Sequence, residues 1–355
     1  MQIRLSQLLP RRRRHLGGLL GVGLAGVAVV TASASSNVAH KTHARGLPAA
    51  AVMPAQPVPA GVSAALVRQP CFGAASRNPL QPCVNARLNF AVTPAPQIAR
   101  RVPNTPCKLI LGSPDVCEFG VPAAQARATI ALVGDSHAGH WRGAVADVAL
   151  AHDWRGLSIT HTSCPLSKAV RKLPTPARFE ACVAWKNEVF AWFAHHAEVH
   201  TVFVSGLSGG AGVYPSDGRS ELQTSEAGYV AAWNALPKSV QHIVVIRDTP
   251  KMLADTNACV AAAVRARRPP GVVCAVPRSE VLDPDPLVAA ARRLHSPRVQ
   301  VIDMTRYFCG SKLCYPVIGG ALVLRDVTHM SSVYSTSLGP YLLRAVNALM
   351  ASWNG

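Results

Sequence analysis

The feature that most constrains the fold of this chain is an apolar run that stops abruptly at a serine. Residues 128–141 read ATIALVGDSHAGHW, which is a strand-like stretch, then Gly-Asp-Ser-His, then a segment compatible with a helix. In an open parallel sheet, ligands bind at the carboxyl ends of the strands, and a serine at a strand-to-helix turn exposes its hydroxyl there. Ser136 is therefore a candidate nucleophile, and a helix-capping role is the alternative. His137 and His140 flank this turn, either as substrate contacts or as polar groups for the helix start.

A second motif lies far downstream, where residues 322–332 read LVLRDVTHMSS. Asp326 and His329 stand three residues apart, after a strand-like run and before a helix. A serine hydroxyl becomes a good nucleophile when an imidazole removes its proton and a carboxylate orients that imidazole. The sequence thus predicts Asp326 and His329 as the catalytic partners of Ser136.

Apolar strand-like runs alternate with helix-compatible segments from residue 128 onward. This alternation predicts a parallel sheet covered by helices on both faces, a three-layer α/β/α sandwich with about five parallel strands. Because Ser136 follows the first strand and the Asp-His pair follows the last, we expect both at the carboxyl edge of the sheet. The expected strands are 129–134, 156–160, 201–206, 242–248 and 299–303, and the expected helices are 139–152, 178–197, 226–236 and 286–294.

The early GDSH and the late D-x-x-H together resemble the SGNH hydrolase superfamily, in its branch found as the extracytoplasmic domain of acyltransferase-3 membrane proteins. Three further stretches are similar to that branch: SCPL at 163–166, IVVIRDTP at 243–250 and CGSKLCYPVIGGALVLRD at 309–326. The resemblance spans residues 128–351. It implies a flavodoxin-like fold and a serine esterase or O-acyltransferase that needs no metal or organic cofactor. It also implies a cell-envelope carbohydrate or glycolipid as substrate.

This sequence departs from the superfamily pattern at the oxyanion hole. The superfamily carries a Gly and an Asn after its second and third strands, whereas the matching stretches here read THTSCPL and VSGLSGG, with no G-x-N-D. The predicted oxyanion donors are the backbone N–H of Ser136 and groups near Ser163 and near Ser205 or Gly206. Ordinary loop roles are the alternative for the residues outside the serine turn.

The N-terminal region has the pattern of an export signal. Five arginines and no acid precede about 17 apolar residues and an Ala-Ser-Ala sequence. Residues 1–34 are thus predicted as a cleaved signal peptide, with an N-terminal membrane anchor as the alternative. The Ala- and Pro-rich residues 35–70 are predicted as a flexible tether. Residues 71–127 are expected to form a disulfide-stapled extension with an edge strand at 86–92, and 128–355 the SGNH-like domain.

The ten cysteines fall into five pairs that are close in sequence. Disulfides persist in oxidising compartments, so this pattern predicts a protein that acts outside the cytoplasm. Pairing of nearest neighbours is a hypothesis, because ten cysteines allow many connectivities. No C-x-x-C occurs, which argues against zinc. The hypothetical pairs are Cys71 with Cys83, Cys107 with Cys117, Cys164 with Cys182, Cys259 with Cys274, and Cys309 with Cys314.

The chain is basic, with 36 Lys and Arg residues against 18 Asp and Glu, a net charge of +18. A basic exported protein tends to sit on anionic envelope surfaces, and no nucleic-acid recognition module is present. No second segment is apolar enough to span a bilayer, so a separate membrane acyltransferase is the expected acyl donor if the protein transfers acyl groups. A plain carbohydrate acetylesterase and a non-catalytic envelope-binding module are the alternative functions.

Overall fold

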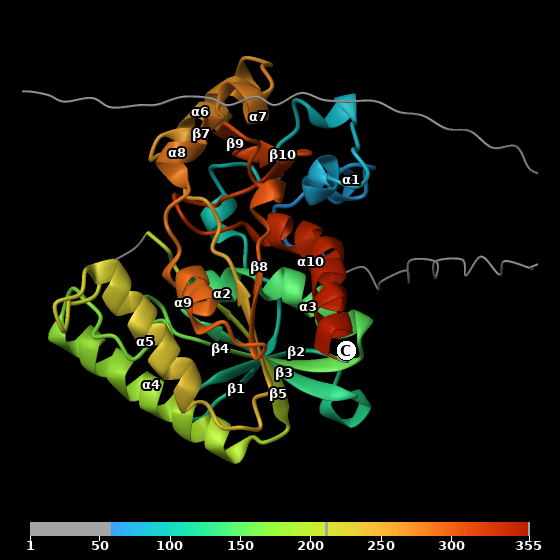
Figure 1. The fold of residues 1–355 in the computed structure, drawn as a ribbon. Helices are drawn as coiled ribbons and strands as arrows, with labels where there is room; N and C mark the ends of the chain where they lie inside the picture. Colours follow the sequence, from blue (N-terminus) through green and yellow to red (C-terminus); the bar gives the residue numbers. More distant parts are fainter. Residues whose placement is uncertain (1–57, 210–211, 354–355) are drawn as a thin grey trace, which may run out of the picture. The chain divides into compact units, whose positions relative to one another are not determined.

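A seven-stranded sheet forms the centre of the fold (Figure 1). The computed structural model describes residues 58–209 and 212–353. Strands β4, β3, β5, β6 and β8 are parallel neighbours in that order, which confirms the five predicted strands and matches the 2-1-3-4-5 order of flavodoxin-like folds. Beyond β4, strands β2 and β1 extend the sheet in antiparallel pairing. The bounds are β1 (Lys108–Ile110), β2 (Val116–Gly120), β3 (Ala128–Gly134), β4 (Trp154–Thr160), β5 (Val199–Ser205), β6 (His242–Ile246) and β8 (Val299–Ile302).

Helices cover both faces of this sheet. One face carries α3 (Arg142–Ala151) and α10 (Ser332–Trp353), and the other carries α4 (Pro176–His195), α5 (Glu221–Ala235) and α9 (Pro286–Leu294). Successive strand residues point to opposite faces. In β3, Ile130 and Leu132 therefore join the α3 and α10 side of the core, whereas Ala131 and Val133 join the other side. The predicted three-layer α/β/α sandwich is confirmed.

Side-chain caps define where the helices on the second face begin. The Thr175 hydroxyl accepts a backbone N–H at the start of α4, and Ser220 forms a capping box with Gln223 at the start of α5. Asp285 caps α9 and is followed by Pro286 at the first helical position. The capping box explains why α5 begins five residues before the predicted start at 226, since the apolar pattern alone does not mark a polar first turn.

The residues before β3 are part of the folded unit. Val62, Leu66 and Val67 pack against the core, so the segment predicted as a tether is folded from residue 58 onward. The edge strand predicted at 86–92 is wrong: a 3-10 helix, η2 (Ala86–Leu88), forms there because the Asn85 side chain accepts the N–H of Arg87. The other short elements here are α1 (Ala64–Val67), η1 (Gly73–Arg77), η3 (Ala99–Arg101) and η4 (Ala123–Gln125).

Short elements also connect β6 to α10. The strand-like run directly before the Asp-His pair forms only β11 (Ala321–Leu322), which pairs with β10 (Val317–Ile318) outside the main sheet. The Asp-His pair therefore lies in a loop anchored by this small hairpin. The remaining elements are α6 (Thr256–Arg265), α7 (Pro270–Val273), β7 (Val276–Pro277), α8 (Arg278–Val281), η5 (Thr305–Tyr307) and β9 (Leu313–Cys314).

All ten cysteines form the five predicted nearest-neighbour disulfides. The signal or anchor predicted at 1–34 and the first part of the predicted tether lie outside the described residues. Among the residues that the structure describes, no helix has both the length and the hydrophobicity needed to cross a bilayer.

Candidate active site

The serine turn begins where β3 ends. Gly134 has a φ of +150°, and a Cβ at this position would lie 2.1 Å from the carbonyl oxygen of Ser205 in the neighbouring strand. Only glycine permits this close approach and this backbone conformation. Asp135 then caps α2 (Ser136–His140) by accepting the N–H of His137, at 2.8 Å. Ser136 thus becomes the first residue of a helix that starts at the carboxyl edge of the sheet.

The structure brings the three predicted catalytic residues together. His329 Nε2 lies 2.9 Å from Ser136 Oγ, and His329 Nδ1 lies 3.0 and 3.1 Å from the two carboxylate oxygens of Asp326. An ionised carboxylate only accepts hydrogen bonds, so we assign the proton of the neutral ring to Nδ1. Nε2 is then free to accept the serine proton, which is the arrangement that a general base requires.

Local backbone contacts hold Asp326 as a carboxylate. Its Oδ1 accepts the backbone N–H groups of Thr328 and His329, at 3.0 and 2.8 Å. Burial by itself raises the pKa of Asp326, but the hydrogen bonds from His329 and Thr328 outweigh it and hold this pKa well below its usual value. The carboxylate is therefore ionised throughout the neutral range, and it stabilises the imidazolium that forms when His329 takes a proton.

The predicted oxyanion residues lie beside this site at the same sheet edge. Gly134 pairs with Thr160 of β4 on one side and with Ser205 of β5 on the other. The carboxyl ends of these three strands therefore lie side by side at the same edge of the sheet. Ser163 follows β4 in a turn with a φ of +61°, and Gly206 follows β5 and is buried. The backbone N–H of Ser136, at the first helical position, has no partner carbonyl within its own helix. The oxyanion roles of Ser163 and Gly206 stay predictions.

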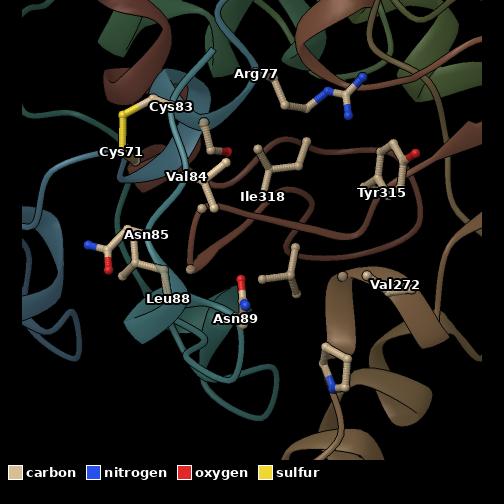
Figure 2. A pocket seen from close by; sticks show the side chains of 16 residues that line it. Cys71, Arg77, Cys83, Val84, Asn85, Leu88, Asn89, Val272, Tyr315 and Ile318 are labelled. Atoms are coloured by element: carbon tan, nitrogen blue, oxygen red, sulfur yellow. A yellow bond between two sulfur atoms is a disulfide. The ribbon is translucent and has the colours of Figure 1, made fainter.

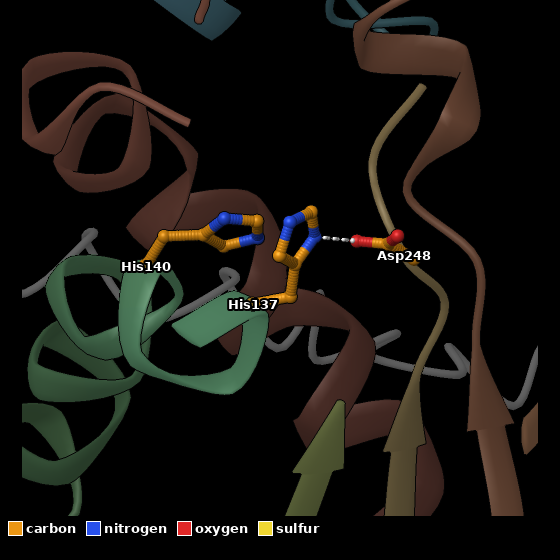
Figure 3. A group of neighbouring side chains, drawn as sticks. All are labelled: His137, His140 and Asp248. Carbon is orange, nitrogen blue, oxygen red and sulfur yellow. Dashed lines mark hydrogen bonds and ion pairs between the residues drawn. The ribbon is translucent and has the colours of Figure 1, made fainter. Parts of the chain in front are cut away.

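A second His-Asp pair lies next to Ser136, since His137 directly follows Ser136 in the chain and its side chain faces Asp248 (Figure 3). His137 Nδ1 lies 2.7 Å from Asp248 Oδ1, and both side chains are almost completely buried. The other carboxylate oxygen accepts the N–H and the hydroxyl of Ser208. Burial lowers the pKa of His137, but the carboxylate of Asp248 outweighs burial and raises it above its usual value. His137 is therefore held inside the protein and is closed to substrate.

His140 connects the serine helix to the loop that carries His329. Its Nδ1 accepts the backbone N–H of Met330, at 3.2 Å, directly after His329. Burial lowers the pKa of His140 far below its usual value, so the ring is neutral. An Nδ1 that accepts a hydrogen bond leaves the proton on Nε2. The ring thus holds the loop that carries His329 in position, and its burial closes it to substrate.

The three buried side chains His137, His140 and Asp248 have possible metal-ligand atoms within 4.8 Å of one another. Their hydrogen bonds do not fit a metal site. A metal-bound imidazole donates its second N–H to an acceptor, whereas the second nitrogen of His140 faces the N–H of Met330. The Nδ1 of His137 and the Oδ1 of Asp248 already bond to each other. We therefore interpret this cluster as a hydrogen-bonded support for the serine turn.

Comparison with known proteins gives the family. A model of the SGNH domain (fused to AT3 domains) matches residues 102–344. The chain belongs to this family. In structure, the SGNH domain is similar to the periplasmic domain of the lipopolysaccharide acetyltransferase of Salmonella ser. Paratyphi A, with a TM-score of 0.49 and 11% sequence identity over 64% of this chain and 90% of that one. No curated protein sequence matches significantly.

Sequence reasoning assigned no role to two acidic residues that support the site of this SGNH domain. Asp248 lies two residues after the end of β6, and its backbone N–H donates to Asp285 at the start of α9. The available signal was a carboxylate at the end of an apolar run, at the edge of the sheet where ligands bind. Its partner, His137, is 111 residues away in the chain, which the local pattern cannot indicate.

Proposed function

We propose that this SGNH domain is an exported serine esterase or O-acyltransferase that works through an acyl-enzyme on acyl esters of cell-envelope carbohydrate or glycolipid. The observation that carries the proposal is the continuous hydrogen-bonded chain from Ser136 through His329 to Asp326. Membership of an esterase and acyltransferase family supports the same chemistry.

The geometry suits a two-step acyl transfer. Ser136 Oγ attacks the acyl carbonyl carbon while its proton passes to His329 Nε2, and Asp326 stabilises the resulting imidazolium. The imidazolium then returns the proton to the departing alcohol oxygen, which leaves the acyl group on Ser136. In the second step, His329 removes a proton from water or from a sugar hydroxyl, and the oxygen of that group attacks the acyl carbon. The acyl group leaves Ser136, and His329 returns the proton to the serine oxygen. The backbone N–H of Ser136 is the first candidate to bind the oxyanion, with donors near Ser163 and Gly206 beside it.

The export part of the proposal rests on the cysteines and the N-terminal sequence. Five disulfides occur in the structure, and such bonds persist in oxidising compartments. The arginine-rich start followed by an apolar run is typical of an export signal. An enzyme outside the cytoplasm has no acyl-thioester pool, so transfer needs a donor such as a separate membrane acyltransferase.

Labelling with a fluorophosphonate probe tests the catalytic assignment. The wild-type protein should become labelled and should hydrolyse an aryl acetate, and Ser136→Ala should lose both activities by several orders of magnitude while melting normally. Ser279→Ala, at an exposed serine in α8, is the matched control and should behave as wild type. Equal ester turnover in Ser136→Ala and wild type would show that this serine is not the nucleophile.

Simple hydrolysis is the second candidate, and the exposure of the triad favours it. The side chains of His329 and Asp326 are 27% and 21% exposed, so water reaches the general base in the free protein. A transferase must hold its acceptor at a high effective concentration to compete with that water. The assay supplies an activated acetyl ester with envelope oligosaccharides and the membrane fraction, and measures acetate and acetyl-sugar separately. If acetate is the only product, acyl transfer is rejected and the esterase function remains.

A further inference from the structure

A hollow lined by three arginines lies at the carboxyl end of β8. Its volume is about 650 Å³, and Arg77, Arg278 and Arg306 all contribute to its wall. These residues come from three separate parts of the chain: η1, the start of α8 and η5. Since like charges repel, three guanidinium groups gathered from distant segments cost folding free energy unless something of opposite charge binds among them.

The protein does not neutralise this charge. Of the residues lining the hollow, Asp303 alone is acidic, and it forms an ion pair with Arg247 at 3.5 Å. Within residues 58–209 and 212–353, none of the three lining arginines has a carboxylate within ion-pair distance. The hollow therefore carries an excess of positive charge.

Two of the arginines are held in place by contacts that leave most of their N–H groups unused. Arg77 Nε donates to the carbonyl of Arg306 at 3.2 Å. Its guanidinium lies over the ring of Tyr315, 4.6 Å from the centroid; Figure 2 shows these two side chains in a neighbouring pocket that they both line. Arg278 Nη1 donates to the carbonyl of Gly310 at 3.0 Å, in the loop closed by the Cys309–Cys314 disulfide. Fixed guanidinium groups lose less entropy when they bind an anion.

The chemistry of the arginine side chain determines which ligand suits this hollow. A guanidinium group presents several N–H donors in a planar fork, and such forks bind the oxygens of phosphate groups with charge-assisted hydrogen bonds.

We propose that this hollow is a binding site for a phosphate group, carried either by a lipid headgroup or by a soluble phosphorylated compound. The phosphate dianion offsets two of the three arginine charges and presents enough oxygens to accept N–H groups from each of them. A single carboxylate has two oxygens and one charge, and it leaves part of the cluster unpaired. The site is separate from Ser136 and does not depend on the proposed catalytic activity.

Titration calorimetry with inorganic pyrophosphate at low ionic strength tests the proposal. The wild-type protein should bind saturably, and acetate at the same concentration should not compete. Arg306→Gln is the informative variant, because this side chain is exposed and makes no ion pair that the fold requires. It should weaken binding at least tenfold, and Arg77→Gln with Arg306→Gln should abolish it. Arg265→Gln, an exposed arginine at the end of α6, is the control and should bind as wild type.

Vesicles separate the two sources of phosphate. Binding to phosphatidic acid vesicles but not to phosphatidylcholine vesicles, lost in Arg306→Gln, would identify a lipid headgroup as the ligand. Pyrophosphate binding without vesicle binding would identify a soluble phosphorylated compound. Aryl acetate hydrolysis should be the same in all these variants. A failure of the phosphate-site proposal can therefore be distinguished from a failure of the catalytic assignment. Absence of saturable pyrophosphate binding, or equal weakening in Arg265→Gln, would overturn the proposal.

Discussion

Replacing Asp326 by asparagine tests whether this carboxylate controls the tautomer of His329. Asp326 Oδ1 accepts two backbone N–H groups, at 2.8 and 3.0 Å, and the amide oxygen of asparagine keeps both bonds. The amide nitrogen then takes the place of Oδ2, which lies 3.1 Å from His329 Nδ1. The remaining oxygen lies 3.0 Å from Nδ1 but already accepts two backbone N–H groups, whereas the new amide nitrogen offers an N–H where Nδ1 had a second acceptor. We therefore expect Nδ1 to become an acceptor and the ring proton to move to Nε2.

The shifted proton faces the nucleophile. His329 Nε2, 2.9 Å from Ser136 Oγ, then donates a hydrogen bond and cannot remove the serine proton. In serine hydrolases with the wrong tautomer, kcat falls by about 10⁴, which corresponds to ~5 kcal/mol of lost transition-state stabilisation. We expect a loss of this size in Asp326→Asn with little change in melting temperature, because the backbone contacts of the side chain persist.

The assay measures aryl acetate turnover and the rate of fluorophosphonate labelling, together with the ¹⁵N chemical shifts of the His329 ring. Asp115→Asn is the matched control, since Asp115 is exposed and its carboxylate likewise accepts a backbone N–H, from Gly112 at 3.0 Å. That variant should retain wild-type turnover. If folded Asp326→Asn stays within tenfold of wild type, or if its ring proton remains on Nδ1, the tautomer argument is refuted.

Three further predictions concern the residues around the triad. Gly134→Ala should lower the free energy of unfolding by at least about 2 kcal/mol in urea titrations, because the new Cβ meets a backbone carbonyl of β5, whereas Gly139→Ala, which gains only ordinary contacts, should not. His140→Ala should cost about 1–3 kcal/mol by leaving a buried N–H unpaired, and kcat should fall more than KM changes; an unchanged kcat would contradict its positioning role. Burial raises the pKa of Asp285 to about 6, against about 3.9 in an unfolded chain, so its contribution to stability is complete below pH ~4 and is lost as the pH rises through 6. The difference in unfolding free energy between wild type and Asp285→Asn should therefore change between pH 4 and 6 and be constant above pH 7; a difference independent of pH would refute this.

The sequence predicted the features that repeat locally or depend on residue type. Alternation of apolar runs with helix-compatible segments predicted the five parallel strands, because strands buried on both faces need continuous apolar residues. The same order placed Ser136 and the pair Asp326 and His329 at one edge of the sheet, and the structure brings them into hydrogen-bonding distance. Nearest-neighbour cysteine spacing also matched all five disulfides.

Tertiary structure alone decided how the turn that carries Ser136 is supported. His137 and Asp248 are 111 residues apart, and His140 and Met330 are 190 residues apart, so no local period links them. The antiparallel addition of β2 beside β4 likewise depends on an unpaired strand edge that exists only once the sheet has formed. Sequence periodicity reports which face of an element is buried, whereas the partner of a buried polar group is fixed by the packing of elements that are distant in the chain.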